Sequence, residues 1–152
     1  MSATQPTYHD AELILKLYEL RREPVMREAR DFVANFAPRS VDDLLAAANN
    51  AGKENAYIRQ VYGYWEMAAS FVAHGVLNAL LAYDTLQEMY FAYAKIQPFL
   101  EESRQRQGAP DFLTNLRKVV EGSTEGREGV ARLRKRQAEM ARRRAEAAKQ
   151  GT

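Results

Sequence analysis

Glu66 is the residue with the strongest claim to chemistry, because it follows the only tryptophan of the chain, Trp65, on an apolar segment. A carboxylate in such a segment must stay in contact with water or find a cation, since an unpaired buried charge is strongly unfavourable. The sequence therefore predicts a structural ion pair between Glu66 and an arginine of the N-terminal region: Arg21, Arg22, Arg27 or Arg30.

The alternative for Glu66 is a general acid or base with a raised pKa. That role needs a second polar group in a cleft, and no pattern in the sequence supplies one. A phosphate-binding glycine loop and a Gly-x-Ser-x-Gly elbow are both missing from the sequence. We therefore expect no catalytic residue, while the question whether the protein is an enzyme stays open.

The two histidines offer little metal chemistry. His9 precedes Asp10 and Glu12, which are common ligand types, but acidic residues at a helix start also interact favourably with the helix dipole. His74 falls at the predicted end of a helix, where a basic side chain is favourable. Because no second cluster of ligands is present, we expect neither a metal site nor a cofactor.

A row of basic residues near the C-terminus is the best candidate for contacting a partner. Residues 121–152 carry nine Lys or Arg against five Glu, whereas residues 1–120 carry thirteen against fifteen acidic residues. Such a row can contact phosphates in a salt-dependent way, but no aromatic residue lies among its members to stack on a base. Its members are Arg132, Arg134, Lys135, Arg136, Arg142, Arg143 and Arg144.

The same C-terminal segment has a weak pattern for pairing with another helix. Val130, Leu133, Gln137, Met140 and Arg144 occupy the a and d positions of a heptad, and the apolar series fails after Met140. Any coiled-coil contact with a protein partner or a second copy should therefore be short. Without a partner, this segment predicts a solvent-exposed helical tail.

The element that must position Glu66 is a central helix from about Glu54 to His74, ending at Gly75. Its apolar face is formed by Ile58, Val61, Tyr62, Trp65, Ala68, Ala69 and Val72. So wide an apolar arc must be covered by several partners. Gly63 interrupts this helix at some cost in stability, which predicts the close approach of a neighbouring element.

Caps and prolines predict the remaining helices. Thr7 with Asp10, Ser40 with Asp43, Asn78, and Asp84 with Gln87 are helix starts, Pro24 suits a first turn, and Pro98 predicts a break around residues 95–97. The expected helices cover about 8–22, 24–37, 40–48, 79–83, 84–100 and 112–122, with a tail helix over 124–150. No segment alternates with period two.

The predicted fold class is therefore all-α, an irregular single-domain bundle of about six or seven helices over residues 1–122, followed by a basic, solvent-exposed helical tail over 123–152. The uncharged run from Met67 to Tyr83 is short for a membrane span and is interrupted by polar residues, so we expect no span. The lack of cysteine and of a secretory signal favours a cytoplasmic location.

The segment Tyr64–Asn78, YWEMAASFVAHGVLN, followed by Tyr83 and Asp84, resembles a bacterial family of short, uncharacterised helical domains. The resemblance covers roughly residues 8–120 and implies an all-helical fold and a bacterial source. The family has no activity to carry over. Many members have a membrane anchor ahead of the domain, and we expect none here.

Function is expected to be non-enzymatic, either protein interaction or a structural role. The alternative is weak, non-specific binding of nucleic acid through the basic C-terminal helix. A small-molecule enzyme or sensor that uses Glu66 is the third reading.

Overall fold

The computed structural model describes residues 4–151, and these residues form nine α-helices and one 3-10 turn. No strand occurs in this part of the chain, so the predicted all-α class is confirmed. In chain order the elements are α1 (Tyr8–Arg21), α2 (Pro24–Asn35), α3 (Val41–Ala48), α4 (Lys53–Ala73), α5 (Ala79–Thr85), α6 (Glu88–Ile96), η1 (Gln97–Phe99), α7 (Leu100–Gln107), α8 (Thr114–Glu121) and α9 (Thr124–Gln150).

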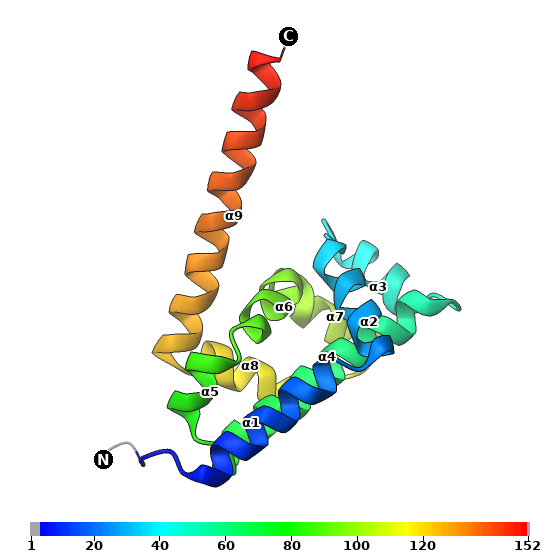
Figure 1. Cartoon of the computed structure of the whole chain (residues 1–152). Coiled ribbons are helices and arrows are strands. Elements are labelled where there is room, and N and C mark those ends of the chain that lie inside the picture. Colours follow the sequence, from blue (N-terminus) through cyan, green and yellow to red (C-terminus); the bar gives the residue numbers. More distant parts are fainter. Residues whose placement is uncertain (1–3, 152) are drawn as a thin grey trace.

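The predicted central helix is α4, which lies in the middle of the body (Figure 1). Trp65, Ala68 and Ala69 on this helix are completely buried. Helices α2, α3 and α8 pack against it. Helix α1 reaches it through Tyr64, whose hydroxyl donates a hydrogen bond of 2.7 Å to the carbonyl of Leu17. The wide apolar arc is thus covered from several sides, as its width requires.

Most of the predicted helix starts are confirmed, because capping depends on neighbours in the sequence. Thr7 and Asp10 form the expected capping box. Ser40 and Asn78 cap α3 and α5 with their side chains. Asp10 also accepts a 2.7 Å hydrogen bond from the backbone N–H of Asn78, which ties the start of α1 to the start of α5. Hydrogen bonds, above all from the Thr7 backbone, lower the pKa of Asp10.

The segment from residue 79 to 107 contains more breaks than predicted. The chain was expected to start a long helix at Asp84, but α5 continues to Thr85 and α6 begins at Glu88. Pro98 ends α6 in the 3-10 turn, as expected from its missing N–H. The helix count therefore exceeds six or seven.

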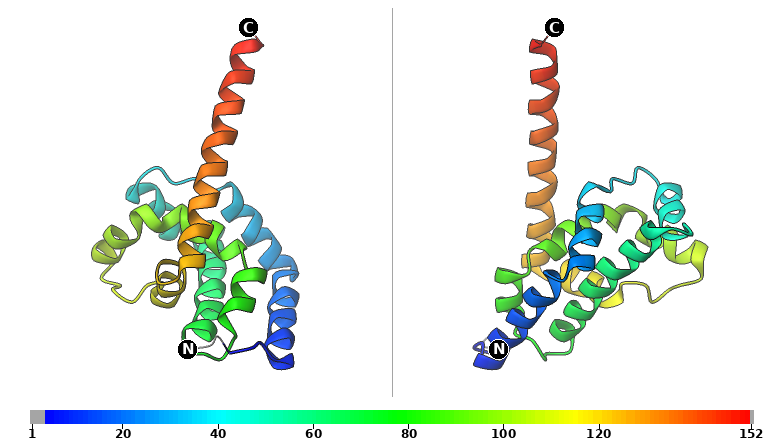
Figure 2. Two further views of the ribbon diagram at one scale, coloured as in Figure 1. Left: turned by 90° about the vertical axis from the view of Figure 1, so that its left-hand side faces the viewer. Right: turned by 45° about the vertical axis from the view of Figure 1, so that its right-hand side comes forward.

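Helix α9 leaves the body and projects far beyond it (Figures 1 and 2). Its first turns are nevertheless packed against α6 and α8, with Gly126, Gly129 and Val130 buried. A Cβ atom at Gly129 would lie 2.7 Å from the Tyr90 ring, so glycine permits the close packing of α9 on α6. The expectation of an exposed helix beginning directly at residue 123 was thus wrong for these turns. After Leu133, every residue through Gln150 is exposed.

The expectation for Gly63 was also wrong. A Cβ atom at this position would meet no other atom within 4 Å, so no neighbouring element approaches closely. Gly63 instead borders an open cavity.

Among the described residues, no helix is both long enough and apolar enough to cross a membrane.

Candidate functional site

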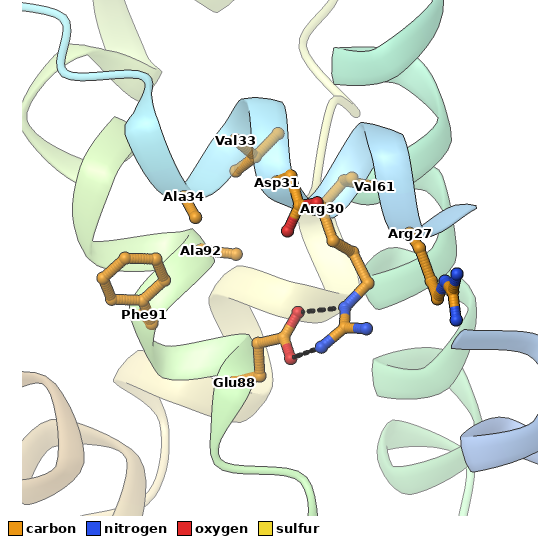
Figure 3. A pocket seen from close by; sticks show the side chains of 9 residues that line it. All are labelled: Arg27, Arg30, Asp31, Val33, Ala34, Val61, Glu88, Phe91 and Ala92. Atoms are coloured by element: carbon orange, nitrogen blue, oxygen red, sulfur yellow. Dashed lines mark hydrogen bonds and ion pairs between the residues drawn. The ribbon is translucent and has the colours of Figure 1, made fainter. Parts of the chain in front are cut away.

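Arg21, Arg30 and Glu88 form a partly buried charged cluster where α1, α2 and α6 meet. Arg30 donates two hydrogen bonds to the Glu88 carboxylate, from Nε to Oε1 at 2.8 Å and from Nη2 to Oε2 at 2.6 Å (Figure 3). Arg21 donates to Oε2 of the same carboxylate. A bidentate arginine–carboxylate pair is strong and geometrically specific. The cluster therefore determines how the three helices dock.

The charges of this cluster stabilise one another. Burial by itself would raise the pKa of Glu88, but the hydrogen bonds from Arg30 and the charge of Arg21 outweigh it and lower that pKa. The guanidinium carbon of Arg21 also lies 4.6 Å from the centre of the Tyr18 ring and 5.4 Å from that of Trp65, within the range of cation–π attraction. The Glu88 carboxylate therefore stays ionised at neutral pH.

A pocket of about 470 Å³ lies beside this cluster, with Val33 and Phe91 in its wall (Figure 3). The exposed side chain of Arg27 also lines it and has no hydrogen bond or ion pair within the part of the chain that the structure describes. Arg30 and Glu88 are occupied with each other. The cluster is thus suited to holding helices together, and Arg27 is the lining cation that remains available to an anion.

Glu66 is bound by the start of α8 and not by one of the predicted arginines. Its Oε1 accepts hydrogen bonds from the backbone N–H and the side-chain amide of Asn115, each at 2.9 Å. Its Oε2 accepts from the N–H of Leu116 at 2.8 Å. The predicted ion pair of Glu66 is corrected accordingly: Arg21 and Arg30 bind Glu88, and Arg22 and Arg27 are exposed.

Helix geometry explains this correction. Val61 borders the pocket that α2 lines, and Glu66 follows it by five residues. At 100° per residue, the two side chains lie about 140° apart around α4. Glu66 therefore faces α8, on the side of α4 away from the arginines of α1 and α2.

The carboxylate of Glu66 caps α8 because the N-cap residue of this helix has no side-chain acceptor for the first N–H groups. That residue, Leu113, has a left-handed φ of 59° and provides no side-chain cap. The first N–H groups of a helix have no acceptor within the helix, and a negative charge there is favourable to the helix dipole. Glu66 thus caps α8 from another helix.

A second cavity, of about 440 Å³, lies beside Glu66 between α3, α4 and α7. Ile58, Tyr62 and Leu113 are among the apolar side chains in its wall. Glu66 lines it as well, but both of its carboxylate oxygens are engaged by α8. Glu66 therefore does not face an empty polar cavity.

The histidines lie at exposed helix ends. His9 Nδ1 is 3.4 Å from a carboxylate oxygen of Glu12, and His74 is the C-cap residue of α4. Within the described part of the chain, no group of three or more His, Cys, Asp or Glu side chains is arranged to hold a metal ion.

The basic row divides into paired and unpaired cations. Arg134 donates to the side chain of Gln97 at 2.6 Å, Arg143 pairs with Glu139 at 2.6 Å, and Arg132 lies 3.8 Å from Glu128. The side chains without an ion pair or hydrogen bond to another described residue are Lys135, Arg136, Arg142 and Arg144. A run of unpaired positive charge therefore follows the exposed part of α9.

Sequence reasoning missed Glu88 and Lys95. Lys95 donates to the carbonyls of Ala34 and Phe36 at 3.1 Å and 2.7 Å, and so satisfies the C-terminal end of α2. Burial lowers the pKa of this ammonium group. The available signal was a charged residue within the apolar run of α6, but nothing local in the sequence indicates its partner.

Comparison with known proteins gives one family. A family model described as a domain of unknown function matches residues 6–123. No curated protein and no solved structure matches the chain. The predicted kinship with an uncharacterised helical family is confirmed by this match, which covers most of the chain, while the bacterial source stays a prediction. The chain belongs to the family described as domain of unknown function DUF4760.

Proposed function

We propose that this is a non-enzymatic association protein whose helical body presents α9 to an acidic protein partner. The observation that carries the proposal is the exposure of every residue of α9 from Arg134 to Gln150. Most helical stability in proteins comes from the packing of one face against other elements, and this part of α9 has no such packing among the described residues. A partner would supply those contacts.

The chemistry of the exposed part points to an acidic partner. Met140 is its only large apolar residue, too little for a stable coiled coil. Lys135, Arg136, Arg142 and Arg144 are unpaired and lie within ten residues of one another. Charge would therefore supply most of the attraction, and self-association through α9 alone would be weak. The lack of cysteine supports a cytoplasmic location for this role.

The test compares the full chain with a variant in which Lys135, Arg136, Arg142 and Arg144 are replaced by glutamine. We expect the wild type to bind poly-glutamate, a model acidic surface, and the variant to lose this binding. The matched control replaces four exposed cations of the body, Lys16, Arg22, Arg39 and Lys53, and changes the net charge equally. If both variants lose poly-glutamate binding equally, the binding depends only on net charge, which would contradict a docking role for α9.

Nucleic acid is the second candidate partner, for a specific reason. The start of α9 places Arg132 and Arg136 beside Phe91 in a hollow of about 330 Å³ between α6 and α9. An aromatic ring next to cations is the usual combination for holding single strands. The sequence did not predict this neighbour, because Phe91 lies on a different helix.

A salt titration tests this candidate. Four phosphate contacts predict that the logarithm of the affinity for duplex DNA falls with the logarithm of salt concentration with a slope of about −3.6. Fluorescence anisotropy with a labelled duplex and a labelled single strand measures it. A Phe91→Leu variant should bind the single strand more weakly and the duplex as tightly as the wild type. If neither oligonucleotide binds at low salt, this candidate is excluded.

A further inference from the structure

The cavity between α3, α4 and α7 has the size and lining of a small-molecule site. It encloses about 440 Å³, within the usual range for ligand pockets. Its apolar lining includes Leu44, Ile58, Tyr62, Ile96 and Leu113. Such walls favour a hydrocarbon group, which gains free energy by leaving water.

Gly63 keeps this cavity open along α4. Glycine weakens a helix interior, and here no neighbour requires it, because a Cβ atom would meet nothing within 4 Å. The missing side chain leaves room in the cavity. Leu113, with its left-handed backbone, forms another part of the wall, and strained residues of this kind concentrate at ligand sites.

Four of the polar side chains that line the cavity have no hydrogen bond or ion pair to another described residue: Arg59, Ser103, Gln107 and Asp111. Ser103 is 97% buried, lines the cavity, and has no hydrogen-bond partner for its hydroxyl among the described residues. Arg59 also lines the cavity and is exposed, and its guanidinium has no ion pair in the described part of the chain. Because Arg59 and Gly63 are four residues apart on α4, they lie on one face of the helix. The cation therefore lies next to the open space.

Neither acidic residue of the lining forms an ion pair with this cation. Glu66 is engaged by the N-terminus of α8. Asp111 is exposed and has no ion pair with Arg59 or with any other described cation. A ligand that reaches into the cavity would thus meet an apolar interior and the free hydroxyl of Ser103. The unpaired side chains of Arg59, Gln107 and Asp111, all three exposed, complete the polar part of the lining.

We infer that this cavity binds a small amphipathic carboxylic acid. The hydrocarbon part lies against Ile58, Tyr62 and Leu113, and the carboxylate pairs with Arg59. The hydroxyl of Ser103 is available to any polar atom that the ligand carries into the cavity. This site is independent of α9 and of the association role proposed above.

Isothermal titration calorimetry on the full chain tests the inference with three ligands of one chain length: decanoate, decanamide and decylammonium. Decanoate should bind saturably, and decanamide at least about tenfold more weakly, because it lacks the charge-assisted pairing with Arg59. Decylammonium should bind more weakly still. Absence of saturable decanoate binding, or tighter binding of decylammonium, would overturn the inference; the second result would make Asp111 the recognising group.

Variants locate the binding. Arg59→Gln should lower the affinity for decanoate about tenfold and leave the affinity for decanamide unchanged. The exposed control Arg22→Gln should change neither affinity. Gly63→Leu fills the cavity from α4 and should abolish binding of decanoate, while Gly63→Ala should retain most of it.

The emission of the buried Trp65 checks that each variant is folded. Ala48→Met, which narrows the cavity from α3, gives a second obstruction in a different helix. Decanoate binding that survives both obstructions would contradict the proposed site.

Discussion

A single partly buried carboxylate, that of Glu66, shows how a charge in a protein can be satisfied without a counter-ion. Three N–H groups of Asn115 and Leu116 hold it, two of them from the backbone at the positive end of α8. Such an arrangement stabilises both partners, since the carboxylate loses its desolvation penalty and the helix gains acceptors. These contacts connect Glu66 of α4 to the start of α8.

Replacing Glu66 by glutamine tests this role. We expect the free energy of unfolding to fall by about 1–2 kcal/mol, because the amide carries no charge and turns a donor toward N–H groups. Urea unfolding at neutral pH measures the change. Glu19→Gln, at an exposed position on α1, is the control and should change stability by less than about 0.5 kcal/mol. Equal stability of the two variants would show that α8 does not depend on this cap.

The Arg21–Arg30–Glu88 cluster is the second place where one carboxylate contributes to the stability of the fold. Glu88→Gln leaves the guanidinium groups of Arg21 and Arg30 without their carboxylate, and we expect a loss of about 2–3 kcal/mol.

The pH dependence of this loss separates Glu88 from other effects. Because the pKa of Glu88 is lower in the folded than in the unfolded chain, its contribution is complete above the unfolded pKa of about 4.3 and is lost as the pH falls through the folded pKa. The stability difference between wild type and Glu88→Gln should therefore shrink below about pH 4. Urea midpoints between pH 7 and pH 3 measure it. A difference that stays constant with pH would mean that Glu88 is not the titrating partner of the arginines.

At the scale of the helix, two glycines inside helices differ in their surroundings: one is packed against a neighbouring side chain and the other is not. A Cβ atom added at Gly129 would lie 2.7 Å from the Tyr90 ring, whereas one added at Gly63 would meet no other atom within 4 Å. Sequence position alone does not distinguish them, since both are glycines inside helices.

Alanine at each position turns this contrast into a matched pair. Gly63→Ala should stabilise the protein by about 1 kcal/mol through helix propensity, which corresponds to about 3 °C in melting temperature. Gly129→Ala should lower the melting temperature in spite of the same gain in propensity, because its methyl group displaces the Tyr90 ring. Thermal unfolding followed by circular dichroism measures both. A higher melting temperature for Gly129→Ala would show that α9 does not pack closely against Tyr90 of α6.

The helix ends could be predicted from the sequence better than the helix contacts. The capping box of Thr7 and Asp10, the caps at Ser40 and Asn78, and the break before Pro98 all depend on residues within four positions. The predicted helix start at Asp84 was wrong, because α5 continues through Thr85. The capping pattern of Asp84 and Gln87 therefore lies within and just after a helix that has already formed.

At the scale of the whole molecule, α9 consists of a packed base and an exposed arm. Val130 and Leu133 contact the core, and the residues after Leu133 through Gln150 are all exposed. The arm therefore adds little to the stability of the body, whatever it contributes to binding.

Two truncations separate base from arm. A chain that ends at Arg134 should unfold within about 0.5 kcal/mol of the full chain, because only exposed residues are removed. A chain that ends at Ser123 should lose about 3 kcal/mol or more, since Val130 and Leu133 no longer cover α6 and α8. Calorimetric unfolding compares the three chains. If the shorter chain is as stable as the longer one, the base of α9 is not part of the core.

The sequence by itself determined the all-α class, the central helix around Trp65, most helix ends and the basic row, because periodicity, capping and charge are properties of neighbouring residues. Only the tertiary structure decided that Glu66 caps α8, that Arg21 and Arg30 share Glu88, that Phe91 lies beside the start of the basic row, and that Gly63 opens into a cavity. These depend on the rotation and spacing of whole helices, which many weak apolar contacts determine together and no short pattern of residues records.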